Sequence, residues 1–250
     1  MSSVSTRKAM EESSLISVII PAVNEAETLG ATLTSVRAQT APCEIIVVDA
    51  QSTDETLALA RGADARVISS LRRQRAAQLN LGAQQASGST LLFLHADTVL
   101  PARALDHITD ALQDRSIIGG AFARRYASSS ITLRATCRLA AWRNRLIGWH
   151  LGDQGMFVRR MTFFQLGGFR EVDRFEDLDF SRRLRAFGRT VTLRPCVTSS
   201  PRRFDRSGPA RTTARDLMLT IRYLITGLPE NGSSSHAPPS YAQPKRIGNL

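Results

Sequence analysis

Four short apolar runs, each followed by a segment with helical features, constrain the first half of this chain most. The runs cover residues 16–20, 44–48, 65–68 and 90–94, and they are rich in β-branched residues. Buried strands that alternate with helices form parallel sheets. The pattern therefore predicts an α/β fold with a mainly parallel central sheet that is flanked by helices on both faces.

The helices of this first half have recognisable starting signals. Asn24 is expected to cap the first helix, and polar residues 52–55 precede the second. The third helix is predicted over 72–86, and Pro101 is expected to start the next one. The second half is less regular. It predicts strands over 117–123, 156–158 and 190–193, a basic amphipathic helix over 131–147, and a helix over 176–187 that ends at Gly188.

The chain is long enough for one large domain, because 42% of its 250 residues are hydrophobic and can form a proper core. We expect a single domain over 16–228, with a first half over 16–120 and a second half over 121–228. Residues 1–15 are expected to be a flexible lead-in. Residues 229–250 are rich in Ser, Pro, Asn and Gly, which is typical of a disordered tail.

Charge is divided unevenly between the two halves. The net charge is +11, but residues 1–120 carry −3 and residues 121–250 carry +14. A basic surface indicates phosphorylated ligands, a membrane surface or nucleic acid as partners. Aromatic residues are few and do not alternate with the basic residues, so few rings could stack on nucleic-acid bases. No nucleic-acid partner is therefore expected.

The cysteines and the termini bear on the compartment. Cys43, Cys137 and Cys196 are isolated, which favours a reducing, cytoplasmic setting. No stretch reaches the roughly 20 apolar residues needed to span a bilayer, and residues 1–14 lack the apolar core of a signal peptide. The apolar segment 217–228 contains Arg222. It is interpreted as a core-packing helix or as an interfacial helix at the inner face of the membrane.

Polar side chains follow three of the predicted strands. They are Asn24 and Glu25, then Asp49, then Asp97. Ligands of parallel α/β sheets bind at the carboxyl ends of the strands, so these side chains should converge at one edge. The chain has no P-loop and no Gly-rich dinucleotide motif after its first strand. A diphosphate bound there would need a metal ion or arginines instead.

An ordered series of motifs resembles a known family. These are Ser17-Val-Ile-Ile-Pro21, Val47-Val-Asp49, Asn80-Leu-Gly82, Leu92-Phe-Leu-His-Ala-Asp97, Gly119-Gly120, Gly152-Asp-Gln-Gly155, Leu166-Gly-Gly-Phe169 and Glu176-Asp-Leu-Asp179. The series is similar to the family 2 glycosyltransferases, which have the GT-A fold. The Gly-Asp-Gln-Gly and Arg-Arg-Phe elements resemble a bacterial subgroup of small members linked to arsenosugar biosynthesis clusters.

The resemblance implies a nucleoside-diphosphate sugar donor bound over the first half of the sheet. Asp49 matches the position that reads the base or the ribose, and Pro21, Asn24 and Glu25 line the same mouth by analogy. A carboxylate there can accept hydrogen bonds from base N–H or ribose hydroxyl groups. The alternative is a capping residue beside a strand end. Ala50 stands where the family has a second Asp.

The resemblance also implies a divalent cation, Mg²⁺ or Mn²⁺. Asp97 matches the last Asp of the family's Asp-x-Asp element, whose task is to hold the ion against the diphosphate. His95 replaces the first Asp. It can hydrogen-bond ribose or phosphate, ligate Mn²⁺ more readily than Mg²⁺, or simply cap its strand.

The catalytic candidates follow from the same resemblance. Asp177 matches the general base that deprotonates the acceptor hydroxyl in an inverting transfer, and Glu176 is its orienting neighbour or an acceptor contact. Asp153 and Gln154 are expected to contact the sugar or the acceptor, with a turn-forming role as the alternative. Asp179 is interpreted as a first-turn helix carboxylate.

Three arginines complete the predicted site. Arg75 lies at the start of the third predicted helix, near the expected diphosphate. Arg202 and Arg203 resemble part of a motif of polymerising relatives, but Phe204 stands in place of Trp, which disfavours processive synthesis. The pair is expected to clamp the diphosphate or an anionic acceptor. The acceptor itself is open between a small molecule and a lipid.

Two other functions compete with glycosyl transfer. A sugar nucleotidyltransferase has a similar sheet, but it needs a Gly-rich basic loop after the first strand, which residues 21–25 lack. A basic, non-enzymatic module that binds polyanions or membranes would explain the +14 half. It predicts strongly salt-dependent binding and no turnover.

Overall fold

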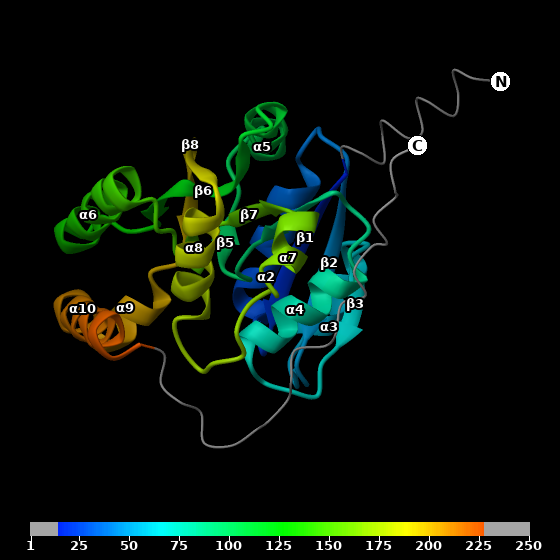
Figure 1. Cartoon of the computed structure of the whole chain (residues 1–250). Coiled ribbons are helices and arrows are strands. Elements are labelled where there is room, and N and C mark those ends of the chain that lie inside the picture. Colours follow the sequence, from blue (N-terminus) through cyan, green and yellow to red (C-terminus); the bar gives the residue numbers. More distant parts are fainter. Residues whose placement is uncertain (1–14, 228–250) are drawn as a thin grey trace, which may run out of the picture.

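A mixed sheet forms the centre of this protein, whose computed structural model describes residues 15–227. The expected lead-in before residue 15 and the expected tail after residue 228 lie outside the described residues. Eight strands are found in the described part, in the spatial order β3-β2-β1-β4-β7-β6-β8-β5 (Figure 1). They are β1 (Ile16–Ala22), β2 (Cys43–Asp49), β3 (Arg66–Ser69), β4 (Thr90–Phe93), β5 (Thr98–Val99), β6 (Ile117–Tyr126), β7 (Met156–Arg159) and β8 (Arg189–Ser199).

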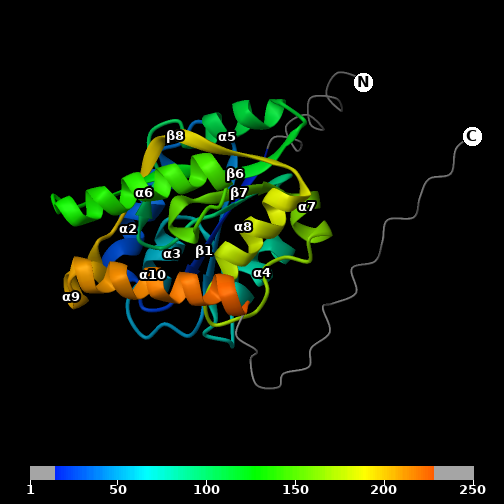
Figure 2. The same ribbon diagram turned by 60° about the vertical axis from the view of Figure 1, so that its left-hand side comes forward.

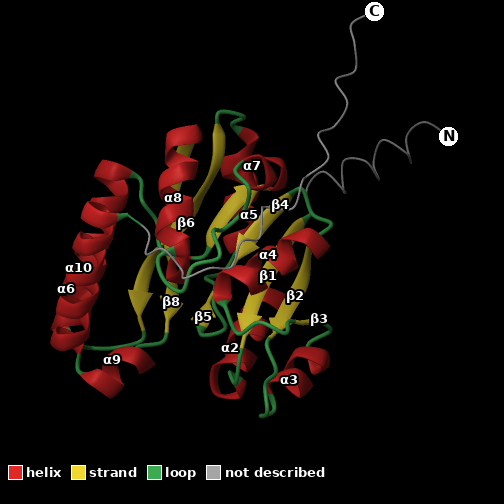
Figure 3. Cartoon of the chain, turned by 60° about the horizontal axis from the view of Figure 1, so that its bottom comes forward, coloured by secondary structure: helices red, strands yellow, loops and turns green. Residues whose placement is uncertain are grey.

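Helices flank this sheet on both faces (Figure 3). They are α2 (Ala26–Arg37), α3 (Thr56–Gly62), α4 (Arg75–Gln85), α5 (Ala104–Gln113), α6 (Ile131–Ile147), α7 (Arg160–Gln165), α8 (Glu176–Phe187), α9 (Arg202–Ser207) and α10 (Pro209–Thr226), with one 3-10 turn, η1 (Gly152–Gln154). The α/β fold expected from the sequence is therefore confirmed, and its mixed sheet agrees with a GT-A fold.

The first half of the sheet is parallel, as expected. β1 pairs in parallel with β2 and β4, and β2 pairs in parallel with β3. β7 is antiparallel to both β4 and β6, whereas β6 and β8 are parallel. The boundary expected at residue 120 falls inside β6, so the two halves share one continuous sheet.

Alternate residues of the buried strands face two separate apolar layers. Val18 and Ile20 of β1 pack with α2, α3 and α5, while Ile19 packs with α4, α7 and α8 on the opposite face. A strand buried on both faces favours apolar side chains, which explains the Val-Ile-Ile run at 18–20. Its one buried polar residue, Ser17, donates a hydrogen bond to Glu44 Oε1 at 2.5 Å. Gly82 of α4 lies so close to β1 that an added Cβ would come within 2.5 Å of Ile19 Cγ2.

Several helix starts differ from the expectations. The helix predicted over 72–86 begins at Arg75, and the helix expected from Pro101 begins at Ala104. Asn24 does not cap α2, whose N-cap is Glu25. Instead Asn24 has a left-handed backbone with φ of 52°, and its Oδ1 accepts a hydrogen bond from Thr53 N at 2.8 Å. The side chain therefore ties two loops together rather than closing a helix.

Helices α6 and α10 lie side by side at one end of the molecule, outside the layers that cover the sheet (Figure 2). The prediction of a helix over 131–147 is confirmed residue for residue. The α10 side facing inward carries Tyr223, whose ring stacks on Phe175 with 5.1 Å between ring centroids. Among the described residues, no helix is long and apolar enough to cross a membrane.

Candidate active site

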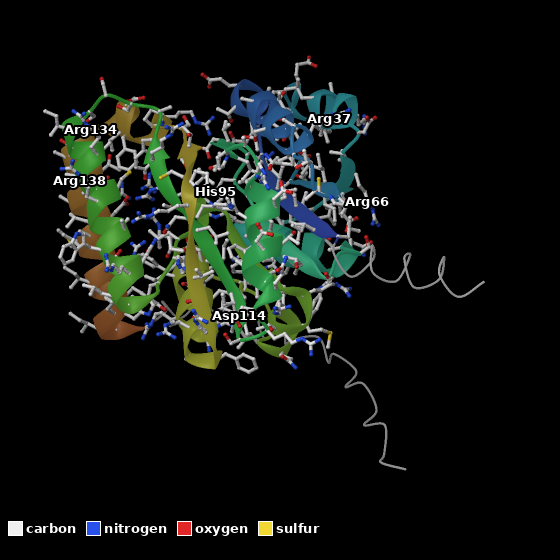
Figure 4. The ribbon with its side chains drawn as sticks, turned by 90° about the horizontal axis from the view of Figure 1, so that it is seen from above. Arg37, Arg66, His95, Asp114, Arg134 and Arg138 are labelled. Carbon is white, nitrogen blue, oxygen red and sulfur yellow. The ribbon has the colours of Figure 1, made fainter. Side chains whose placement is uncertain are left out.

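The carboxyl ends of β1, β2 and β4 meet at one edge of the sheet, and most of the predicted site residues lie there. Ala22 at the end of β1 is in register with Asp49 at the end of β2. β4 leads directly into His95 and Asp97, and Figure 4 shows His95 in the middle of the molecule. A small pocket at this edge is lined by Arg75, His95, Glu176 and Asp177 together with Gly152.

An ion pair joins the first turns of two helices in this pocket. Arg75, the first residue of α4, donates from Nε to Oε1 of Glu176, the first residue of α8, at 2.5 Å. The Glu176 side chain is 2% exposed, and its Oε2 is buried without a hydrogen-bond partner. Burial and the charge of Asp177 raise the pKa of Glu176, against the opposing effect of Arg75. The pocket thus holds a carboxyl group that binds a proton more readily than usual.

Asp177 is oriented by a backbone donor from the loop before β7. The N–H of Gly152 donates to Asp177 Oδ2 at 2.7 Å, and Asp177 Oδ1 accepts from Leu178 N at 2.7 Å. A Cβ on Gly152 would come within 2.7 Å of His95 Nε2 and 3.2 Å of Asp177 Oδ2. The close approach of three chain segments therefore requires glycine at this position.

His95 sits opposite these acids. Its Nε2 lies 3.4 Å from Nη1 of Arg75. Burial and the adjacent Arg75 charge lower the pKa of His95, so the imidazole is neutral at pH 7. Arg is a donor only, which makes Nε2 the acceptor in this contact and leaves the ring proton on Nδ1.

Asp153 is held by residues that the sequence did not single out. Arg124 pairs with Asp153 Oδ2, and the Tyr126 hydroxyl donates to the same oxygen at 3.2 Å. Burial, the largest single effect, would raise the pKa of Asp153, but the Arg124 charge and the other charged and hydrogen-bonding groups around the carboxylate together lower it. Asp153 Oδ1 is buried and has no hydrogen-bond partner. One oxygen of this carboxylate is therefore buried without a hydrogen-bond donor.

Gln154 has a different environment from its neighbour. Its side chain is buried, donates from Nε2 to Phe122 O at 2.9 Å, and accepts from Leu151 N at 3.0 Å. Arg143 of α6 also donates to Gln154 Oε1 at 3.1 Å. These bonds fix the loop that carries Gly152, in line with the turn-forming alternative.

The residues expected at the nucleotide lie around β1 and β2. Asp49 is 2% exposed, and both of its oxygens accept hydrogen bonds from Ser52, as in a capping turn. Pro21 is in β1, and Asn24 is the exposed start of the following loop. Glu25 accepts a hydrogen bond from Arg202 of α9. The capping role, which was the alternative for Asp49, accounts for the hydrogen bonds of both carboxylate oxygens. The contact of Asp49 with a nucleotide stays a prediction.

The two C-terminal arginines diverge. Arg202 Nη2 donates to Glu25 Oε2 at 2.7 Å and lies 4.0 Å from Asp97 Oδ2, so it links the nucleotide half to α9. Arg203 pairs with Asp216 of α10, and its side chain is 67% exposed. The structure therefore brings Arg202, but not Arg203, to the predicted site.

A divalent cation would find one protein ligand of the right kind here. Within residues 15–227, no group of three or more His, Cys, Asp or Glu side chains is arranged to hold a metal ion. The Asp97 carboxylate is 26% exposed at the edge of the site. A single carboxylate suits Mg²⁺ or Mn²⁺ when diphosphate oxygens and water complete the coordination. The residues present fit an ion shared with a donor, not one held by the protein alone.

Comparison with family models places most of this region in a known family. Residues 17–167 match the model described as glycosyl transferase family 2. The matched residues include β1 through β7 and the loop with Gly152, but they end before Asp177. A comparison with curated proteins gave no significant match.

Solved structures of similar fold were also found. TarS of S. aureus is 19% identical with a TM-score of 0.61, and 74% of this chain covers 36% of TarS. The structure of TarS residues 1–349 in complex with UDP-GlcNAc is 19% identical with a TM-score of 0.61, and the match covers 74% of this chain and 58% of that structure. The mannosyltransferase PcManGT from Pyrobaculum calidifontis, in complex with GDP-Man and Mn²⁺, gives 22% identity, a TM-score of 0.59 and coverage of 74% and 56%. The chain thus spans between about a third and three fifths of these structures.

Proposed function

The chain belongs to glycosyl transferase family 2, and from that premise we propose that it is an inverting, metal-assisted glycosyltransferase with Asp177 as its general base. The observation that carries the proposal is the convergence of Arg75, His95, Glu176 and Asp177 in one pocket at the carboxyl ends of the parallel strands. The donor is proposed to be a nucleoside-diphosphate sugar. UDP-GlcNAc and GDP-Man are bound in two of the similar structures.

In this proposal the acceptor hydroxyl lies against Asp177. As the hydroxyl oxygen forms its bond to the anomeric carbon, the proton passes to the Asp177 carboxylate. The bond from the anomeric carbon to the diphosphate breaks on the opposite face, and its electron pair leaves with the diphosphate. Gly152 N–H keeps the carboxylate oriented for this transfer. A positioned base of this kind contributes about 10²–10⁴-fold to the rate.

The ion pair between Arg75 and Glu176 also has a role in this scheme. It holds a guanidinium beside His95, on the side of the pocket that faces the end of β4. A guanidinium can form paired hydrogen bonds with phosphate oxygens, so Arg75 is proposed to neutralise charge on the leaving diphosphate. A divalent cation bound at Asp97 would supply further neutralisation of that charge. Arg202 is proposed to reach the same diphosphate from α9.

The proposed acceptor contacts are the unpartnered oxygens of Asp153 and Glu176. Each is a buried acceptor without a donor, and a hydroxylated ligand would satisfy both. The acceptor is proposed to be a hydroxylated small molecule or a lipid. We also propose that the protein is located in the cytoplasm, because its three cysteines are isolated.

The experiment is a screen of nucleotide sugars for binding and for hydrolysis or transfer, with and without Mn²⁺ or Mg²⁺. We expect one donor to raise the melting temperature in the presence of the ion, and the product sugar to have inverted anomeric configuration by NMR. Asp97→Asn should weaken the ion dependence, whereas Asp106→Asn on the surface of α5 should not. Retained configuration, or pyrophosphate release from a nucleoside triphosphate, would contradict the proposal.

A further inference from the structure

The outer side of α6 carries an exposed apolar stripe. Its large members are Ile131, Leu139, Trp142 and Leu146, and each is between 69% and 77% exposed. At 3.6 residues per turn, these four positions share about 80° of the helix circumference. Exposed arginines form a second stripe beside them, made of Arg134, Arg138 and Arg145.

The adjacent helix α10 repeats this arrangement. Its exposed apolar side chains are Leu217, Met218, Ile221, Leu224 and Ile225. They share about 120° of the circumference. Its exposed arginines, Arg211, Arg215 and Arg222, fall within about 40° of one another next to that face. The two helices contact each other, so the stripes belong to one end of the molecule (Figure 2).

Charge on this end is almost entirely positive. Helix α6 contains no acidic residue, and the one acidic residue of α10 is Asp216, which pairs with Arg203. Helices with an apolar stripe bordered by Lys or Arg lie in the plane of a bilayer surface, with the apolar side chains among the acyl chains. Basic residues beside them bind the anionic headgroups.

We infer that the outer faces of α6 and α10 together form a docking surface for an anionic lipid bilayer. The surface consists of the apolar residues and arginines named above. Neither helix can cross a membrane, so the surface lies on the bilayer. A second copy of the chain fits less well, because pairing the same surfaces would bring the six exposed arginines of each copy together. Residues 228–250 fit less well too, because they add Lys245 and Arg246 and only one acidic residue, Glu230.

The surface is linked to the candidate active site by a residue at its flank. Arg143, which lies about 40° round α6 from Leu139, donates to Trp149 O and Gln154 Oε1, both at 3.1 Å. Gln154 belongs to the turn that carries Gly152. A docked α6 would therefore hold the mouth of the pocket at a fixed distance from the lipid surface. Docking is measured by binding alone, so its failure and the failure of glycosyl transfer are distinguishable.

The test is sedimentation of the full chain with phosphatidylcholine vesicles that contain or lack phosphatidylglycerol. We expect binding to the anionic vesicles that weakens with added salt. The double variant R134E/R138E should bind at least about 20-fold more weakly, since each basic residue near a bilayer contributes about fivefold. The matched control is R37E/R66E, which makes the same charge change at the far end of the molecule (Figure 4). It should bind almost as the native chain does.

A second measurement reports the apolar stripe directly. The chain has two tryptophans, so a Trp149→Phe variant leaves Trp142 as the sole indole. Its emission should shift to the blue with anionic vesicles and be quenched by brominated lipid. Absence of vesicle binding, equal loss in both double variants, or an unshifted Trp142 would overturn the inference. A dimer of the native chain in light scattering would also overturn it, if Trp142→Ser dissociated that dimer and the native chain did not bind vesicles.

Discussion

The backbone N–H of Gly152 lies 2.7 Å from Oδ2 of Asp177, and this contact joins the loop before β7 to the first turn of α8. The two residues are 25 positions apart in the sequence, and the fold brings them together. In the proposed chemistry, Asp177 accepts the proton and Gly152 orients it. The other oxygen of the Asp177 carboxylate accepts from Leu178 N within the helix itself. The glycine donor fixes one of its oxygens and orients the group toward the pocket.

Replacing Asp177 by Asn should remove the proposed base while keeping the volume of the side chain. We expect kcat to fall about 10²–10⁴-fold with little change in the melting temperature. Steady-state kinetics with the donor found in the screen measure this. Asp173→Asn, an exposed site four residues earlier, is the matched control and should keep its activity. Near-native turnover of Asp177→Asn would show that another group accepts the proton.

Gly152→Ala should damage the same step without removing any polar group. The added methyl would lie 2.7 Å from His95 Nε2 and must displace either that ring or the Asp177 carboxylate. We expect a loss of at least about tenfold in kcat, consistent with the steep effect of small misplacements on catalysis. Gly30→Ala is the control, since a Cβ there meets nothing within 4 Å. It should stabilise α2 by about 0.5–1 kcal/mol. Equal activity of both variants would contradict the close-contact argument.

The two neighbouring arginines of α9 should behave differently. Arg202→Ala removes a charged hydrogen bond to Glu25 and the nearest cation to Asp97. We expect the donor KM to rise about tenfold, which corresponds to the lower end of the range for hydrogen bonds to charged groups. Arg203→Ala removes an exposed pair with Asp216 and a cation–π contact with the Phe204 ring, and it should leave the KM unchanged. A matching effect of both substitutions would mean that overall charge, and not the site, is responsible.

His150 should make the fold sensitive to mild acid. Burial and the charge of Arg143 lower the pKa of His150 from 6.5 to about 4. The unfolded chain therefore binds this proton first, and the stabilisation present above pH 6.5 is lost as the pH falls toward 4. The loss amounts to about 3 kcal/mol. Urea unfolding between pH 7 and pH 4.5 should show it, and His150→Gln should flatten the profile. His107→Gln is the control and should retain the slope.

The first half of the fold was predictable because its elements obey local rules. A short β-branched run such as 16–20, which ends at Pro21, is typical of a strand that is buried on both faces, and the convergence of strand ends at one edge follows from parallel pairing. The helix over 176–187 also begins where its three acidic residues favour a helix N-terminus. The prediction that Asn24 caps the first helix was wrong, because the Asn24 side chain accepts a hydrogen bond from Thr53 in another loop instead.

The partners of the site residues were not predictable from the sequence. Arg124 and Tyr126 reach Asp153 because β6 runs beside β8 and under the turn at 152–154, and no local pattern records such a crossing. The Gly-Asp-Gln-Gly motif drew attention to that turn, but the sequence did not indicate which of its groups would line the pocket. The backbone of Gly152, more than the side chain of Gln154, faces the pocket.

The stacking of Tyr223 on Phe175 gives the C-terminal helix a share in the proposed chemistry. Phe175 has a left-handed backbone with φ of 67°, an uncommon conformation for a bulky residue, and it directly precedes Glu176 and Asp177. Tyr223 covers the ring of the residue that sets the first turn of α8. A chain that ends before α10 would keep every side chain of the pocket and lose this cover. Such a truncated enzyme should therefore lose turnover as well as its lipid-facing helix.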